Sequence, residues 1–161
     1  MREVRAVVEN QVARMYSTLE KIILLKSVSL FSNIPVGKLA KIAGITQETR
    51  LPAGEVVMRA GEFGDSLFIV ADGTVRVHKA GQDLARLTKG DCVGEMALLD
   101  HSPRSADVTV DEDASLLRIG REDFNELMAV NPEMMLAIVQ LLVRRLREAN
   151  DKLTRRSDGT A

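Results

Sequence analysis

Glycine-containing turns break the middle of the chain, about residues 46–120, into short runs. The runs lie at a spacing of roughly ten residues, which is typical of a β-sandwich, a jelly roll or a barrel. Each run is bounded by residues that break regular structure. The breaks are Pro52-Ala53-Gly54, Ala60-Gly61, Asp72-Gly73, Ala80-Gly81 and Lys89-Gly90-Asp91.

Three of these runs have the character of strands, namely residues 66–71, 74–79 and 82–87. Apolar and polar residues alternate most clearly from Val75 to His78, as they do in a half-buried strand. Asp72-Gly73 separates the first two runs, and a dipeptide of this kind between strands favours a tight hairpin. We therefore predict a mainly β core with a hairpin turn at Asp72-Gly73.

Helical patterns precede this β zone. Residues 4–26 contain no Gly or Pro and have one apolar stripe at a spacing of three and four. Ser17 and Glu20 have the spacing of a capping box, which would divide the stripe into two helices near Tyr16. A further short helix is expected between Pro35 and Gly44.

Helical patterns also follow the β zone. Residues 121–130 are expected to form one helix, and a second is expected from Glu133 to about Arg156. Asn131-Pro132 separates the two. The last residues, 157–161, are polar or small and are expected to be frayed.

The 161 residues suit one core, and 22 basic against 23 acidic side chains give a net charge of −1. That balance argues against a protein that holds a nucleic acid over its whole surface. One cysteine and two histidines are too few for an internal disulfide or a multi-cysteine zinc site. The longest apolar stretch, residues 134–143, is about half of the length that a membrane span needs. With no secretory signal visible, we expect a cytoplasmic protein without membrane insertion.

Residues 63–67, Phe-Gly-Asp-Ser-Leu, spell the sequence that carries the nucleophile in one class of serine esterases. Such a serine needs a histidine base, and in that class an acid lies three residues before the histidine. Val75 and Leu98 occupy those positions before His78 and His101. We therefore interpret Ser66 as the start of a strand and expect no enzymatic activity.

Residues 94–106 have the composition of a small anion site. Gly94 allows backbone angles that other residues avoid, and the amides that follow would open a short helical turn towards an anion. Arg104, ten residues on, can place a planar guanidinium on two phosphate oxygens. The Glu95 carboxylate can accept hydrogen bonds from sugar hydroxyls. Together these groups predict a nucleotide site.

The local charge narrows the class of nucleotide. Residues 91–113 include seven acidic side chains, and Arg104 is the only arginine or lysine among them. Such a field disfavours a polyphosphate or a nucleic-acid backbone, which needs several cations or a magnesium ion. A cyclic phosphodiester carries one negative charge, so one arginine suffices.

This segment resembles the phosphate-binding cassette of cyclic nucleotide-binding domains, the family of the bacterial catabolite activator protein, protein kinase A regulatory subunits and cyclic nucleotide-gated channels. The resemblance extends over about residues 28–150 and includes Leu51-Pro52-Ala53-Gly54-Glu55 and Gly90-Asp91. It implies an eight-stranded antiparallel jelly-roll barrel with N-terminal helices and a C-terminal lid helix. The ligand would be cyclic AMP or cyclic GMP, with no cofactor or metal. One departure is Val93, where the family often has an aromatic residue.

The resemblance also implies roles for single residues. Glu95 would bind the ribose 2′-hydroxyl, and Arg104 would bind the cyclic phosphate with the support of neighbouring amides and the Ser105 hydroxyl. Asn150 on the last helix would face the base, which favours cyclic AMP, although Ser105 suits either base. The predicted site residues are Gly94, Glu95, Met96, Ala97, Arg104 and Ser105, with Val75 and Leu84 as an apolar wall and Asn150 and Arg145 as base contacts.

Other readings of these residues remain open at this point. Arg104 could pair with Asp100 or Asp107, and Glu95 could be a solvated turn residue. The domain could also be a structural dimerisation module that has kept the fold without the ligand. A fragment of a transcription regulator is a further alternative, since residues 144–156 carry a net charge of +4. A helix-turn-helix module would have to follow this helix, and five residues remain, so we expect no nucleic-acid partner for this chain.

We expect a sensor that regulates a larger protein or an effector of unknown identity. The expected organisation is a helical segment over residues 1–26, a jelly roll over 27–130, a lid and dimerisation helix over 131–156 and a disordered tail over 157–161. The last helix is expected to move on ligand binding and to form a homodimer. The predicted dimer seam is Val139, Leu142, Leu146, Ala149 and Leu153.

Overall fold

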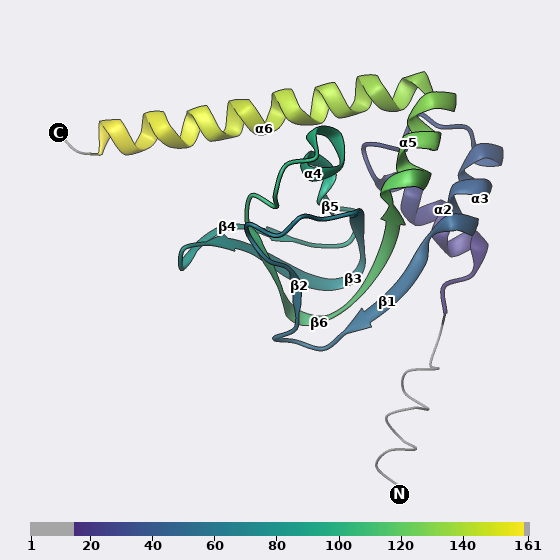
Figure 1. Cartoon of the computed structure of the whole chain (residues 1–161), viewed down its shortest axis with the longest axis horizontal. Helices are drawn as coiled ribbons and strands as arrows, with labels where there is room; N and C mark the ends of the chain where they lie inside the picture. The colour runs from purple at the N-terminus through teal and green to yellow at the C-terminus, as the bar shows by residue number, and fades with distance from the viewer. Residues whose placement is uncertain (1–14, 160–161) are drawn as a thin grey trace, which may run out of the picture.

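The structure, a computed structural model, describes residues 15–159, so the predicted stripe over residues 4–14 lies outside the described residues. Two helices precede a sheet of six strands, one short helix lies within the strand order, and two helices follow (Figure 1). The elements are α2 (Thr18–Ser27), α3 (Val36–Ile45), β1 (Gln47–Leu51), β2 (Val56–Met58), β3 (Ser66–Lys79), β4 (Gln82–Leu87), β5 (Cys92–Val93), α4 (Glu95–Asp100), β6 (Asp107–Gly120), α5 (Arg121–Val130) and α6 (Pro132–Asp158).

The predicted capping box at the start of α2 is confirmed. The Ser17 hydroxyl accepts a hydrogen bond from the backbone N–H of Glu20 at 3.2 Å, and the Glu20 carboxylate accepts one from the Ser17 N–H at 2.8 Å. The helix predicted between Pro35 and Gly44 is α3, which continues to Ile45. Gly44 therefore does not end the helix.

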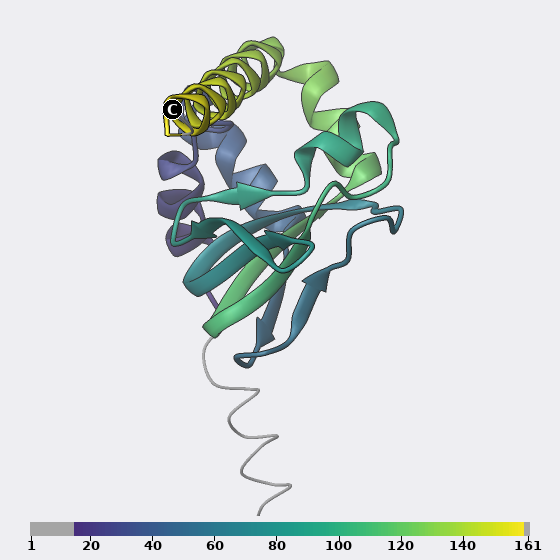
Figure 2. The same ribbon diagram turned by 90° about the vertical axis from the view of Figure 1, so that its left-hand side faces the viewer.

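The six strands form one antiparallel sheet in the order β1-β6-β3-β4, with β2 paired to β6 and β5 paired to β3. β3 and β6 have 14 residues each and pair from Ser66 opposite Gly120 to His78 opposite Asp107. The sheet is strongly curved, and α6 lies along one side of the molecule (Figures 1 and 2). The mainly antiparallel β fold with flanking helices is thus confirmed.

The described strands number six rather than the predicted eight, and their pairing leaves β1 and β4 at the two ends instead of closing a barrel. The hairpin predicted at Asp72-Gly73 is wrong, because β3 runs through these residues with shifts in register on both sides. Gly73 has a φ of +78°, and a Cβ there would lie 2.2 Å from the Asp113 carbonyl oxygen. It therefore forms a bulge that bends the strand. The chain reverses instead at Ala80 and Gly81, whose φ angles of 50° and 78° suit a tight hairpin turn.

Two clusters of buried apolar side chains flank this bend. The larger packs the helices against one end of β3 and β6 and includes Phe31, Phe124 and Met134. The smaller lies at the other end of the same strands and includes Val75 and Val110. β3 and β6 contribute to both clusters, so one strand pair joins the helical end of the molecule to the end that carries β4.

The two C-terminal helices follow the predicted pattern, with α5 over the predicted residues and α6 starting at Pro132. The frayed tail is wrong in part, since Ser157 and Asp158 still belong to α6, whose C-terminal half extends past the sheet (Figure 1). Within residues 15–159, no single helix has both the length and the apolar character needed to cross a membrane. Only α5 and α6 taken together meet that test, and they are bent by 111° where they join.

Candidate functional site

A cavity of about 510 Å³ lies between the sheet, the segment over residues 94–106 and one face of α6. That volume is within the range of small-molecule sites. Its sheet side is apolar, whereas the 94–106 segment and α6 bring charged groups to the opposite sides. The apolar side chains are Met58, Val77, Leu84, Leu87, Val93 and Val108, and the α6 residues are Arg145, Glu148, Ala149 and Lys152.

Arg104 lies on the polar wall of this cavity and is only 8% exposed. Its guanidinium donates hydrogen bonds to the carbonyl oxygens of Gly94 at 3.0 Å and Ser66 at 2.7 Å. Burial is the main cause that lowers the pKa of Arg104 from its ordinary value, and the nearby charge of Arg121 acts in the same direction, while Asp65 opposes both. Since both hydrogen bonds are to neutral carbonyls, the guanidinium can still receive an anion from the cavity.

The two acidic residues considered as alternative partners of Arg104 are engaged elsewhere. Asp100 accepts hydrogen bonds from Ser102, and Asp107 accepts one from the backbone N–H of Ala60 at 2.9 Å. Of the ion pairs between described residues, none includes Arg104. The interpretation of Arg104 as half of a surface ion pair is therefore wrong.

Gly94 allows the chain to pass beneath this arginine. Its φ is +100°, and a Cβ there would lie 2.6 Å from Nη1 of Arg104 and 2.8 Å from the Ser66 carbonyl oxygen. Glycine is therefore required both for backbone conformation and for space. The next residue, Glu95, begins α4, so the predicted helical turn after Gly94 is confirmed.

Glu95 is completely buried, which excludes the reading as a solvated turn residue. Its Oε1 forms an ion pair with Arg145 of α6, and Arg145 also donates to the Cys92 carbonyl oxygen at 3.3 Å. Its Oε2 has no hydrogen-bond partner in the structure. A buried carboxylate oxygen of this kind needs a donor, and the cavity that Glu95 lines is the place from which one can come.

The structure brings most of the predicted site residues to this cavity. Gly94, Glu95, Met96, Ala97, Arg104, Ser105, Leu84 and Arg145 all line it. Val75 does not, because it is 1% exposed in the smaller core cluster, where the lining residues Val77 and Leu87 pack against it. Asn150 is exposed and lies outside the lining.

Sequence reasoning missed three residues of α6 that face the cavity, namely Glu148, Ala149 and Lys152. They lie three, four and seven positions after Arg145. Residues at these spacings share one face of a helix. With Arg145 at the site, helical periodicity alone predicts that these three residues face the cavity and that Asn150, five positions after Arg145, does not.

The esterase-like serine is part of the framework. Ser66 is 1% exposed, and its hydroxyl donates to the Asp65 carboxylate at 2.7 Å. The two histidines contact other groups, since His78 lies 2.8 Å from the Thr109 hydroxyl and His101 contacts Arg121. Ser66 thus begins β3 as predicted, and neither histidine is placed to activate it.

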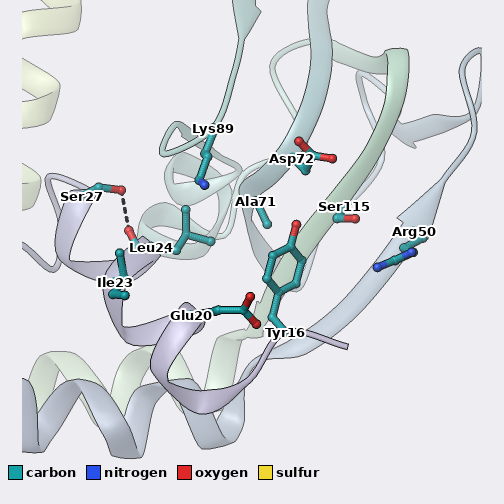
Figure 3. A pocket seen from close by; sticks show the side chains of 10 residues that line it. All are labelled: Tyr16, Glu20, Ile23, Leu24, Ser27, Arg50, Ala71, Asp72, Lys89 and Ser115. Carbon is teal, nitrogen blue, oxygen red and sulfur yellow. Dashed lines mark hydrogen bonds between the residues drawn. The ribbon is translucent and has the colours of Figure 1, made fainter. Parts of the chain in front are cut away.

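A second cavity of about 510 Å³ lies between α2 and the strands β1, β3 and β6. Figure 3 shows the Tyr16 ring between α2 and these strands, with Lys89 and Asp72 at the rim. Its charged residues are of both signs, and none of the buried unpartnered polar atoms among the described residues belongs to its lining. The cavity beside Arg104 and Glu95 is therefore the stronger candidate for a ligand.

A curved antiparallel sheet that holds a buried arginine and a buried carboxylate under a C-terminal helix is the arrangement of a cyclic nucleotide-binding domain. The cyclic nucleotide-binding domain family matches residues 48–131, and the chain belongs to this family.

Relatives agree with this assignment. The chain is 36% identical over 134 residues to the cyclic AMP receptor protein of Thermus thermophilus, covering 80% of this chain and 62% of that protein. It is 37% identical over 117 residues to human cGMP-dependent protein kinase 2, covering 68% of this chain and 15% of the kinase. The chain thus spans less than two thirds of either relative.

Solved structures show the same fold. The structure titled cAMP bound PfPKA-R superposes with a TM-score of 0.74 at 25% identity, over 85% of this chain and 47% of the other. The Thermus thermophilus catabolite activator protein superposes with a TM-score of 0.73 at 36% identity, over 80% of this chain and 63% of the other.

Proposed function

We propose that the cavity beside Arg104 binds a cyclic nucleotide and that the protein is a regulatory sensor of that ligand. The observation that carries this proposal is that two buried charged side chains in the cavity lining each keep an unused capacity for hydrogen bonds. The Arg104 guanidinium contacts only carbonyl oxygens, and Oε2 of Glu95 accepts nothing. A cyclic phosphate complements the first, and a ribose 2′-hydroxyl complements the second.

The direct test is calorimetric titration with cyclic AMP, cyclic GMP and linear AMP. A cyclic nucleotide at about 100 times its dissociation constant should also stabilise the fold by roughly 2.7 kcal/mol. Linear AMP should bind much more weakly, because its doubly charged phosphate does not match one guanidinium. Absence of heat and of any thermal shift with either cyclic nucleotide at millimolar concentration would refute ligand binding and favour a structural module of the same fold.

We propose cyclic AMP as the preferred ligand, with the base contact assigned to Glu148 in place of Asn150. Glu148 lines the cavity, and its carboxylate can accept from the exocyclic amine of adenine, where guanine presents a carbonyl oxygen. Glu148→Gln should then reduce the ratio of cyclic AMP to cyclic GMP affinity. Asp151→Asn is the matched control, because Asp151 is on the same helix and outside this cavity. Tighter binding of cyclic GMP by the unsubstituted protein would overturn the preference.

The proposed output is a movement of α6. The ion pair between Glu95 and Arg145 connects the segment that would hold the ribose to α6, so ligand contact with Glu95 reaches the helix directly. A helix with two positions is a switch that a ligand can bias by its difference in affinity for them. Hydrogen exchange with and without cyclic nucleotide tests this. Unchanged protection over residues 133–152 at saturation would exclude α6 as the moving element.

The proposed homodimer uses a seam on α6 that differs from the predicted one. Ala149 faces the cavity and Leu142 is partly buried against the core, so neither is free to meet a partner. Exposed apolar side chains instead follow a spacing of three and four, typical of a coiled coil over three heptads. The positions are Leu136, Val139, Val143, Leu146, Asn150, Leu153 and Ser157. Asn150 and Ser157 are polar, and the other five are apolar and more than 40% exposed.

Asn150 in this seam favours a parallel pair of helices, because the two copies then lie side by side and can bond to each other. Leu146→Glu should convert the dimer to monomer in analytical ultracentrifugation. Arg155→Glu, a change of charge on the same helix outside the seam, should not. A monomeric unsubstituted protein at high micromolar concentration would refute the dimer.

A cytoplasmic location, absence of catalysis and an effector outside this chain complete the proposal. The first is testable by fractionation and the second by incubating the protein with cyclic AMP and measuring AMP by chromatography. Formation of AMP would overturn the assignment as a sensor. We also expect no binding of DNA by this chain, and a gel-shift titration with and without cyclic nucleotide tests that expectation.

A further inference from the structure

Arg121, the first residue of α5, contacts two segments around the proposed phosphate site. Its guanidinium donates to the carbonyl oxygen of Gly64 at 2.7 Å and to that of Ala97, within α4, at 3.3 Å, and it also contacts His101, which ends α4. Its backbone N–H donates to the Asp65 carbonyl oxygen at 2.7 Å. One residue of α5 thus fastens both the loop over residues 64–66 and the helix that carries Glu95.

The same loop holds Arg104, since Ser66 accepts from the Arg104 guanidinium at 2.7 Å. The guanidiniums of Arg121 and Arg104 therefore donate to carbonyl groups of the same short segment, residues 64–66. Neither forms an ion pair with a carboxylate of the described residues, and Nε of Arg121 is buried without a hydrogen-bond partner. Asp65, the acidic residue of the loop, is engaged with Arg118 at 3.3 Å.

Two guanidiniums that share a loop repel one another, and the carboxylate of Asp65 opposes that effect at Arg104 without forming an ion pair with it. Arg121 holds the loop through its hydrogen bond to the Gly64 carbonyl oxygen, and the loop holds Arg104 through the Ser66 carbonyl oxygen. Loss of the Arg121 contacts would free the loop and α4 to shift relative to each other. Arg104 would then be held less firmly where the anion is expected.

We propose that Arg121 is a positioning residue for the phosphate site, acting through the loop over residues 64–66 and the C-terminal end of α4. This inference rests on the proposed function, because it concerns how Arg104 is held for a cyclic phosphate. Arg121 lies outside the cavity lining, so it acts on the ligand through Arg104 and α4 and not by contact.

The test compares Arg121→Gln with Arg76→Gln for two ligands, cyclic AMP and adenosine, the latter measured by competition with a fluorescent cyclic nucleotide. Arg76 is the matched control, because it carries the same charge but pairs with Asp83 and Asp111, away from the loop over residues 64–66 and from α4, and it lies outside the cavity lining. Arg121→Gln should weaken cyclic AMP about tenfold or more, equivalent to 1.4 kcal/mol, and weaken adenosine less, because adenosine lacks the phosphate that Arg104 would bind. Equal losses for both ligands, or equal effects of the two substitutions, would overturn the proposal.

A second comparison separates position from charge. Arg121→Lys keeps the charge but not the guanidinium geometry, so it should restore little of the affinity for cyclic AMP. In an Arg104→Lys background, Arg121→Gln should cost less than it does in the unsubstituted protein, since the two residues act as one unit. Full rescue by lysine or strict additivity would contradict the role in positioning. If the unsubstituted protein binds no cyclic nucleotide, the proposed function itself fails, which is a distinct result.

Discussion

Replacing Glu95 by glutamine, in combination with a ligand that lacks the ribose 2′-hydroxyl, measures the proposed ribose contact by itself. The Glu95 side chain is completely buried, with Oε1 paired to Arg145 and Oε2 without a partner. A hydroxyl donating to that charged oxygen should contribute roughly 1.5–3 kcal/mol. On that basis 2′-deoxy cyclic AMP should bind the unsubstituted protein about ten- to 150-fold more weakly than cyclic AMP.

The assay is calorimetric titration of both ligands into both proteins, which gives four dissociation constants. Glu95→Gln keeps the shape of the side chain but removes its charge, so cyclic AMP should lose most of its advantage over the deoxy ligand. The substitution also weakens the contact with Arg145, but that loss affects both ligands and cancels in the ratio. An undiminished ratio in the variant would refute the assignment of Glu95 to the ribose.

Four further predictions follow from the same geometry. Arg104→Ala should weaken the binding of cyclic AMP by about tenfold or more in calorimetry, as expected for a charge-assisted contact. Arg104→Lys should recover only part of that affinity, because lysine lacks the bidentate fork of the guanidinium. Equal affinities of the unsubstituted protein and the alanine variant would contradict the phosphate role. Gly94→Ala should lower the free energy of unfolding, measured in urea, by about 1–3 kcal/mol, because of the φ of +100° and the lack of space for a Cβ. Gly37→Ala, at an open helical position, should raise it by roughly 0.5–1 kcal/mol. Similar changes at the two positions would contradict the requirement for glycine at position 94. Truncation after Arg144 should leave the sheet folded, as judged by circular dichroism, but weaken nucleotide binding and abolish the dimer, since it removes Arg145 and most of the seam. Unchanged nucleotide affinity would argue against α6 as a lid. Burial raises the pKa of the Cys92 thiol to about 11 from an ordinary value of 9.0. As the pH rises, the unfolded chain loses this proton first, so the free energy of unfolding should fall between those two pH values. Cys92→Ala should show a flatter dependence on pH in urea denaturation, and identical profiles for the two proteins would refute the shift.

The sequence was informative where one local signal determined the outcome. The capping box at Ser17 and Glu20, the strand over residues 82–87 and the helix over residues 121–130 agree with the structure because each depends on contacts within a few residues. The Asp72-Gly73 dipeptide misled because its usual preference for a turn gives way to pairing with β6 along the whole of β3. That pairing is a long-range property which no local pattern contains.

The same distinction applies to the site. Arg104 and Glu95 could be identified from the spacing within the 94–106 segment, and the structure brings both to one cavity. The face that α6 presents to the cavity could not be predicted, because it depends on the bend between α5 and α6. An error of one position along the helix placed Asn150 at the site where the structure has Ala149. The role proposed for Arg121 was also inaccessible, since Gly64 and the helix α4, which its guanidinium contacts, lie far from Arg121 and from each other in the sequence.

The long ladder between β3 and β6 has a consequence for the order in which this molecule folds. The chain leaves β3 at Lys79 and returns in β6 at Asp107, opposite His78, so the whole excursion that carries the cavity wall begins and ends at one point of the ladder. Closing that loop is the slow step that non-local strand pairing imposes. We expect the excursion to take its final shape only after the ladder has formed, which would leave the contacts to a nucleotide out of the folding transition state. A bound nucleotide should therefore prolong the lifetime of the native protein without accelerating its formation.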